Sequence, residues 1–97
     1  MKYEIIIAPV AVHGIRRLRG RDRAMVEDAI EKYLRHEPDR TSRSRIKRLR
    51  GLLRPQYRLR VGDMRVFYDV VEDQVHVVAV VMKSAADEWL QMFGVPS

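Results

Sequence analysis

The clearest pattern of apolar and polar positions is a two-residue alternation in the second half of the chain. Tyr57, Leu59 and Val61 alternate with arginines, which is the period of a half-buried β-strand. Gly62-Asp63 follows as a two-residue turn signal, with glycine first as a type II′ turn prefers. Met64–Tyr68 continues as a second strand, so this stretch predicts a β-hairpin.

A loop at Gly62-Asp63 sets which residues of the hairpin face one another. The expected pairs are Val61 with Met64, Arg60 with Arg65, Leu59 with Val66, Arg58 with Phe67 and Tyr57 with Tyr68. One face is then apolar or aromatic throughout, and the other carries Arg58, Arg60, Arg65 and Phe67. Like charges directly opposite each other on a sheet repel, so the second face is either a solvated outer surface or a binding surface for an anion.

A strand and two helices are predicted before the hairpin. Tyr3–Ala8 is short and rich in β-branched residues, which predicts a strand. Apolar residues at helical spacing predict helices over Pro9–Leu18 and Arg23–His36. Gly20 is the expected stop between them and Asp22 the expected N-cap of the second, so the two helices form a hairpin.

The remaining predicted elements are a short turn, a third strand and a last helix. Ile46 and Leu49 have the spacing of one helical turn in the polar segment that leads to the hairpin. Val75–Met82 is nearly all apolar, which predicts a central strand covered on much of both faces. Ser84 is the expected N-cap of a final helix, Ala85–Phe93.

This order of elements predicts an α+β fold in one domain that spans residues 1–97. We expect a three-strand antiparallel meander, joined by the N-terminal strand, with the helices packed on one face. The opposite face would then present the arginines. Apolar residues make up 46% of the chain, which is enough for a single core at this length.

Charge adds a class of partner to this picture, because the chain has a net charge of +6. No Asp or Glu lies between Asp39 and Asp63, so the basic residues concentrate there. Such asymmetry indicates a polyanionic partner such as nucleic acid. The run offers charge without a base-reading pattern, so it is suited to grip an RNA backbone. Its candidate contacts are Arg43, Arg45, Lys47, Arg48, Arg50 and Arg54.

Several classes of site are excluded by what the sequence lacks. There is no cysteine, so disulfides, redox thiols and thiolate metal sites are ruled out. No pair of histidines or acidic residues has metal-ligand spacing, and there is no glycine-rich phosphate loop, so we expect neither metal nor cofactor. No signal peptide, lipidation signal or stretch of transmembrane length is present, which favours the cytoplasm and argues against a membrane partner.

Three motifs in combination resemble a known family. They are IKRLRG at residues 46–51, YRLRVGDMRVFYDV at residues 57–70, and an apolar strand followed by a charged residue. The combination is similar to the RelE/ParE superfamily of type II toxin–antitoxin toxins, over nearly the whole chain. The resemblance implies a toxin that is neutralised by a small antitoxin. RelE-like members enter the ribosomal A site and cut mRNA, whereas ParE-like members poison DNA gyrase.

The resemblance also implies roles for particular residues. Arg58 and Arg60 match the paired basic positions of RelE-like toxins, and Arg65 matches the arginine opposite them. In that family these side chains hold the scissile phosphate and stabilise the charge that develops when the 2′-hydroxyl attacks it, a task for which guanidinium groups are suited.

The chain departs from the RelE-like pattern after its last strand. RelE-like nucleases often carry an arginine and then a tyrosine or histidine there, whereas this chain has Lys83 and neither aromatic residue after it. Arginine is a poor general base because its pKa lies above about 12. Lys83 is therefore the candidate for proton transfer, or else simply a lysine at a strand end. Phe67, on the arginine side of the hairpin, is a candidate for stacking on a base.

Three functions remain open from the sequence. The leading one is a ribosome-dependent mRNA endoribonuclease that inhibits translation. The second is a ParE-like gyrase inhibitor without nuclease chemistry, which the absent tyrosine or histidine favours. The third is an inactive member that only binds its antitoxin. The partners expected are the antitoxin, the ribosome with its mRNA, and operator DNA through the antitoxin complex.

Overall fold

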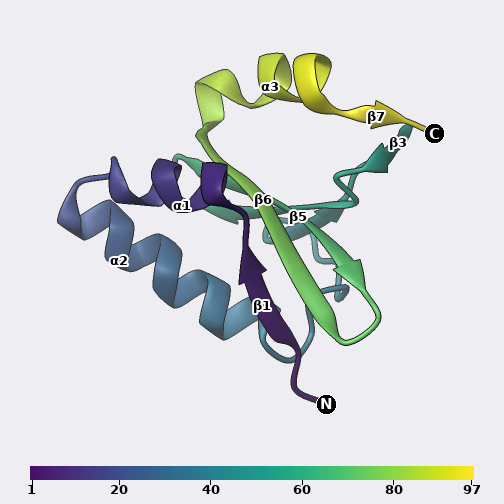
Figure 1. Cartoon of the computed structure of the whole chain (residues 1–97), viewed down its shortest axis with the longest axis horizontal. Helices are drawn as coiled ribbons and strands as arrows, with labels where there is room; N and C mark the ends of the chain where they lie inside the picture. Colours follow the sequence, from purple (N-terminus) through teal and green to yellow (C-terminus); the bar gives the residue numbers. More distant parts are fainter.

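The structure, a computed structural model, describes residues 1–97 (Figure 1). Its main sheet has five strands in the order β1-β6-β5-β4-β2. Its strands are β1 Glu4–Ile7, β2 Ile46–Arg48, β4 Tyr57–Val61, β5 Met64–Val71 and β6 Gln74–Met82. β1 runs parallel to β6, and the other pairs are antiparallel. Two short strands, β3 Leu52–Arg54 and β7 Val95–Pro96, pair separately.

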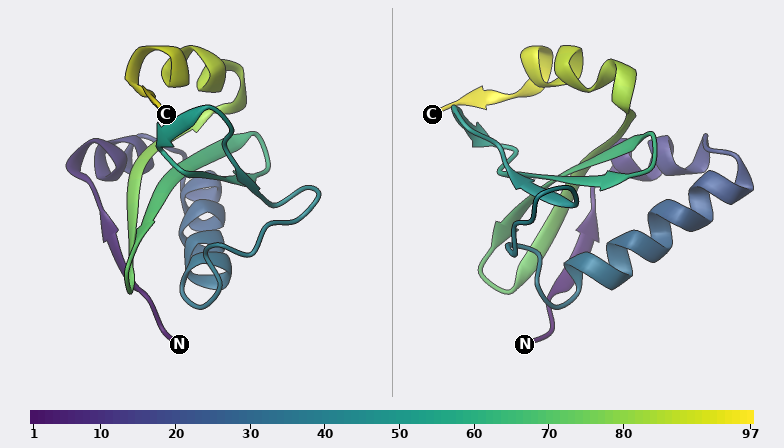
Figure 2. Two further views of the ribbon diagram at one scale, coloured as in Figure 1. Left: turned by 90° about the vertical axis from the view of Figure 1, so that its right-hand side faces the viewer. Right: turned by 180° about the vertical axis from the view of Figure 1, so that it is seen from behind.

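The helices lie on both sides of this sheet. They are α1 Pro9–Arg16, α2 Gly20–Ala29 with a π-helical continuation η1 Ile30–Leu34, and α3 Ala86–Phe93 after a 3₁₀ turn η2 Lys83–Ala85. Apolar residues of α1, α2 and η1 share one core with the inward side chains of the sheet. Helix α3 lies on the other side of the sheet, as Figure 2 shows.

The predicted hairpin is confirmed, including its register. All five expected pairs between β4 and β5 are present, from Tyr57 with Tyr68 to Val61 with Met64. Gly62 has φ of +56°, and Glu72 is the one non-glycine residue with positive φ, so Asp63 has the negative φ of a type II′ turn. The two-residue period therefore sets which side chains of the hairpin reach the core.

The inward face of the hairpin forms the centre of the core. Leu59, Val66 and Tyr68 are fully buried against residues such as Val26 and Leu34 of the helical layer. The Tyr68 hydroxyl donates a hydrogen bond of 2.6 Å to the carbonyl of Pro38, so its polar atom is satisfied inside the core. Burial raises the pKa of this phenol.

The predicted helical turn at Ile46 and Leu49 is wrong, because Ile46–Arg48 forms strand β2. Ile46 lies opposite Leu59 and is buried in the core, while Lys47 lies opposite Arg58. The open edge of β4 supplies backbone hydrogen-bond partners that no local pattern reveals. The three-strand meander is thus extended by β2 on one side and by β1 on the other.

Two helix starts differ from the expectation. The second helix begins at Gly20 rather than Arg23, and Asp22 is not its N-cap but lies in its first turn, where a carboxylate complements the helix dipole. Ser84 caps no helix, since it lies within η2 and makes no capping hydrogen bond. Packing of α3 on the arginine side also differs from the expectation that every helix covers one face.

Candidate nucleic-acid site

The outward side chains of β4 and β5 form what we call the arginine face, made of Arg58, Arg60, Arg65 and Phe67. Pairing of the strands sets Arg60 opposite Arg65 and Arg58 opposite Phe67. Side chains alternate across a strand, so these residues lie on the side of the sheet away from the main core. The sequence prediction of which residues share this face is confirmed.

Arg65 is held against the hairpin turn. Its side chain is 7% exposed, and its Nη1 donates hydrogen bonds of 2.8 Å to the carbonyls of Gly62 and of Met64. Its Nε and Nη2 form no hydrogen bond within the protein, and neither is fully enclosed. The guanidinium group of Arg65 is therefore fixed in place, and its Nε and Nη2 remain free to donate to an external acceptor.

Arg58 is half-buried, and its charge is not compensated. Its Nε is enclosed by the protein and has no hydrogen-bond partner. Burial, and then the charges of Arg65 and Arg60, lower the pKa of the Arg58 guanidinium. A buried donor without a partner costs free energy, and a bound anion would relieve the repulsion among the three arginines.

Arg60 and Lys47 extend the positive surface on either side of Arg58. Arg60 is exposed, with its backbone N–H bonded to the carbonyl of Arg45 at 2.9 Å. Lys47 is exposed on β2, directly opposite Arg58. The structure thus places Lys47, a member of the upstream basic run, beside the hairpin arginines. Positive side chains therefore lie on three neighbouring strands, β2, β4 and β5.

Phe67 is not available to stack on a base, and that prediction is wrong. The side chain is fully buried, and its ring stacks on Trp89 of α3 with 5.1 Å between centroids and 15° between planes. Helix α3 packs on this side of the sheet and takes the contact that we expected a base to make. Trp89 itself is half-buried.

Lys83 lies at the hairpin-turn end of the arginine face. It follows β6 directly, and its backbone N–H donates a 2.7 Å hydrogen bond to the carbonyl of Asp63 in the turn. Its side chain is exposed and forms no hydrogen bond within the protein. This backbone hydrogen bond at the turn is thus the contact that brings Lys83 near the arginines, as expected from the sequence.

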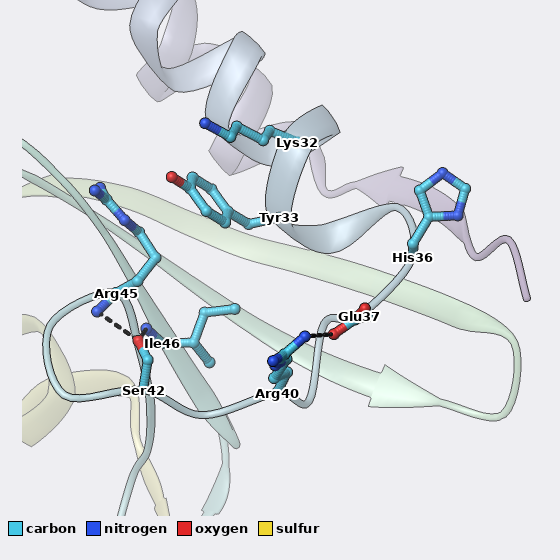
Figure 3. A pocket seen from close by; sticks show the side chains of 8 residues that line it. All are labelled: Lys32, Tyr33, His36, Glu37, Arg40, Ser42, Arg45 and Ile46. Atoms are coloured by element: carbon cyan, nitrogen blue, oxygen red, sulfur yellow. Dashed lines mark hydrogen bonds and ion pairs between the residues drawn. The ribbon is translucent and has the colours of Figure 1, made fainter.

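Arg45 and Arg48 lie against aromatic rings of the chain itself. The guanidinium of Arg45 lies 4.9 Å from the ring centre of Tyr33, and its Nη1 donates a 2.9 Å bond to the carbonyl of Arg60. Figure 3 shows Arg45 facing Tyr33 across a cavity of about 500 Å³ between the helical layer and the segment before β2. Arg48 lies over the ring of Tyr57.

The other members of the predicted nucleic-acid-binding run remain open to solvent. Arg43, Arg50 and Arg54 are exposed, and the side chain of none of them forms a hydrogen bond or an ion pair within the protein. The two ion pairs of the chain, Arg35 with Glu31 and Arg40 with Glu37, lie elsewhere. The side chains of these three arginines are thus solvated.

Asp69 is a buried polar residue on the same outward side that sequence reasoning missed. It is 6% exposed, and its Oδ1 accepts a 2.8 Å hydrogen bond from the backbone N–H of Gln56. Burial raises the pKa of this carboxyl, although the Gln56 bond opposes the shift. The alternation that placed Arg65 and Phe67 outward also places Asp69 there, so the signal was present.

The structure holds neither a metal-binding cluster nor a helix fit to span a membrane. No group of His, Asp or Glu side chains is arranged to hold a metal ion. No helix combines the length and apolar character needed to cross a membrane.

The fold is similar to those of several solved structures. The sequence matches no protein-family model and no curated protein. A chain of the RelBE2 toxin–antitoxin complex from Mycobacterium tuberculosis has a TM-score of 0.70 and 24% identity, covering 84% of this chain and 99% of that chain. A chain of the RelE–RelB complex from Pyrococcus horikoshii has a TM-score of 0.70 and 22% identity, covering 86% and 97%.

A free-state structure of a mutant E. coli toxin RelE is also similar, with a TM-score of 0.69 and 22% identity over 92% of each chain. The chain therefore has the RelE-like toxin fold that its motifs implied.

Proposed function

We propose that the protein is the toxin of a type II toxin–antitoxin system and cuts mRNA on the ribosome in the cytoplasm. The likeness in fold to RelE toxins supports the toxin role. The observation that carries the nuclease is the half-buried guanidinium of Arg58, which has no acidic partner and lies near Arg65, whose guanidinium is held by the turn. Such an arrangement suits a phosphate that gains negative charge during the reaction.

In the proposed reaction the 2′-oxygen of the RNA attacks the adjacent phosphorus and the bond to the 5′-oxygen breaks. The products are a 2′,3′-cyclic phosphate and a 5′-hydroxyl end. Arg58 and Arg65 donate to the non-bridging oxygens, which carry the extra charge in the transition state. Lys83 donates a proton to the leaving 5′-oxygen, and the proton of the 2′-hydroxyl passes to solvent. Arg60 and the basic run hold the RNA backbone.

We propose a cognate antitoxin as the protein partner. Two of the similar chains come from complexes of a toxin with its antitoxin. An antitoxin with acidic segments would complement the basic surface of Arg43, Arg50 and Arg54, which has no acidic partner within the chain. Operator DNA would be reached through the antitoxin rather than through this chain.

Primer extension on cellular mRNA after brief induction tests the nuclease. We expect discrete new 5′ ends in translated messages for the wild type, and a loss of about 100-fold or more for Arg58→Ala. Arg17→Ala is the matched control, because it removes an exposed arginine at the end of α1, outside both the arginine face and the basic run. Growth arrest by the wild type with all messages intact would contradict the proposal.

A gyrase inhibitor is the second candidate, favoured by one observation. No tyrosine or histidine lies between Met82 and the C-terminus, where RelE-like nucleases often carry one. A supercoiling assay with purified gyrase separates the two functions. Inhibition by the wild type, together with intact mRNA in induced cells, would favour gyrase. A chain that never slows growth without an antitoxin would be the inactive form.

A further inference from the structure

A second cavity lies beside the arginine face, between the outward side of the sheet and α3. It has a volume of about 300 Å³. One wall comes from the sheet, another from α3, and the short strands β3 and β7 close one end. Its lining residues are Arg54, Pro55, Asp69, His76, Val78, Trp89, Phe93 and Val95. The proposed cleavage chemistry uses none of them.

The one carboxylate in this cavity has an acceptor to spare. Oδ1 of Asp69 is bonded to the Gln56 N–H, whereas Oδ2 has no hydrogen-bond partner within the protein. Oδ2 is not fully enclosed, although Asp69 as a whole is 6% exposed. Arg54 lines the same cavity without forming an ion pair with it. His76 also lines the cavity and lies opposite Asp69, but its ring bonds to Gln74. A partly satisfied carboxylate in such a cavity favours a ligand that supplies hydrogen-bond donors.

The cavity is placed to read a nucleotide next to the phosphate that the arginines hold. Arg65, Phe67 and Asp69 are successive outward residues of β5, and Arg58 lies opposite Phe67. Outward residues two positions apart on a strand are separated by about 7 Å. A base that enters the cavity therefore belongs to the scissile nucleotide or its immediate neighbour.

We propose that this cavity binds a guanine base of the RNA, with Asp69 accepting hydrogen bonds from the base. An ionised carboxylate only accepts hydrogen bonds. Guanine offers two adjacent donors, N1–H and N2–H, whereas the pairing edges of adenine, cytosine and uracil set each donor beside an acceptor. Trp89 and Phe93 supply aromatic surface for stacking, the usual way in which proteins hold an unpaired base.

This inference rests on the proposed function and adds a base preference to it. Held in this way, guanine would position the RNA so that the neighbouring phosphate meets Arg58. Arg54 is exposed at the cavity and would contact the backbone of the same nucleotide.

Trp89 makes the inference testable without any cleavage, because it is the single tryptophan of the chain and lines the cavity. The purified full-length protein is titrated with GMP, AMP, CMP and UMP while its tryptophan fluorescence is followed. We expect saturable quenching by GMP at concentrations about tenfold lower than for the other nucleotides. Equal quenching by all four nucleotides, or none by GMP, would overturn the proposal.

Asp69→Asn sharpens this test. The asparagine retains an oxygen for the Gln56 N–H but replaces the open oxygen with an amide that donates. We expect GMP binding to weaken about tenfold and the preference over AMP to disappear. Asp73→Asn, an exposed position in the turn between β5 and β6, is the control. Unchanged GMP binding by Asp69→Asn would overturn the role of Asp69, and the wild-type series decides the question if this variant does not fold.

Cleavage mapping separates the cavity from the nuclease. If both proposals hold, guanine is enriched at one fixed position beside the cuts of the wild type and not of Asp69→Asn. Cleavage without a preference for GMP in the titration would remove the guanine cavity and leave the nuclease. A preference for GMP without any cleavage would retain the cavity and remove the nuclease.

Discussion

The two faces of the central sheet differ in how far their polar groups are satisfied. The fully buried side chains of the inward face are apolar apart from the Tyr68 hydroxyl, and that hydroxyl has its acceptor in Pro38. The outward face encloses an unpaired N–H of Arg58 and a carboxylate of Asp69 with one open oxygen. Both faces belong to the same strands. The side chains on one side form a core whose polar atom is hydrogen-bonded, and those on the other side include polar atoms without a hydrogen-bond partner.

This difference is the physical ground for proposing the outward face as the binding face. Folding favours sequences whose local groups are all satisfied, and departures concentrate at functional sites. The inward face meets that condition and accounts for stability. The outward face is less favourable for the free protein, since Arg58, Arg60 and Arg65 repel one another, and a bound anion would reduce that repulsion. Truncation of a buried inward side chain should therefore lower the free energy of unfolding, whereas removal of the Arg58 charge on the outward face should not.

The largest expected effect on stability is for Leu59→Ala on the inward face. Leu59 is fully buried, and truncation of such a residue lowers the free energy of unfolding by about 2–5 kcal/mol. Urea denaturation followed by circular dichroism measures the change. Arg60→Ala, the next residue on the exposed outward side, is the control and should shift stability by less than about 0.5 kcal/mol. Equal losses for both variants would break the contrast between the faces.

Arg65→Ala should have an intermediate effect, because Arg65 has a structural contact as well as a proposed functional one. The substitution removes two hydrogen bonds to the turn carbonyls of Gly62 and Met64, and we expect a loss of about 1–2 kcal/mol. The same urea experiment measures it. A loss of cleavage in this variant is informative only after the folded fraction has been determined. Unchanged stability would show that the turn does not depend on Arg65.

Arg58→Ala should leave the free energy of unfolding unchanged or raise it slightly, although we expect it to reduce cleavage strongly. The folded state disfavours the charged guanidinium, since burial and two neighbouring cations lower the pKa of Arg58. Removal of that cation relieves the cost wherever arginine is protonated. Thermal melting with and without added phosphate provides the measurement. A loss above about 2 kcal/mol would place Arg58 among the structural residues.

Asp69→Asn should have the smallest effect, and the effect should depend on pH. Burial raises the pKa of Asp69 in the folded state, so the ionised carboxylate destabilises the fold above that pKa. The cost is absent below the unfolded value, close to the ordinary 3.8, and complete once the pH exceeds the folded pKa. The variant should melt slightly higher than the wild type at pH 7 and equally at pH 3. A lower melting temperature at pH 7 would contradict this sign.

The core and the hairpin were predictable because they follow from short-range rules. Alternation of apolar and basic residues in β4, with a glycine at the turn, specifies the register, since a shift by one residue would expose Leu59 and bury arginines. The same alternation placed Arg58, Arg60 and Arg65 on one face. It also placed Asp69 there. Asp69 was not among the predicted site residues because it follows Tyr68, where the predicted strand ended.

The local pattern of the chain thus specified the fold class, the hairpin register and which arginines share a face, because each depends on neighbours two or four positions away. Long-range packing settled the rest. Strand β2 exists because the edge of β4 supplies hydrogen-bond partners, and Phe67 is buried because α3 crosses the arginine side. The cavity around Asp69 needs β3, β5, β6, α3 and β7 together. Contacts between segments so far apart in the chain leave no periodic signal in the sequence.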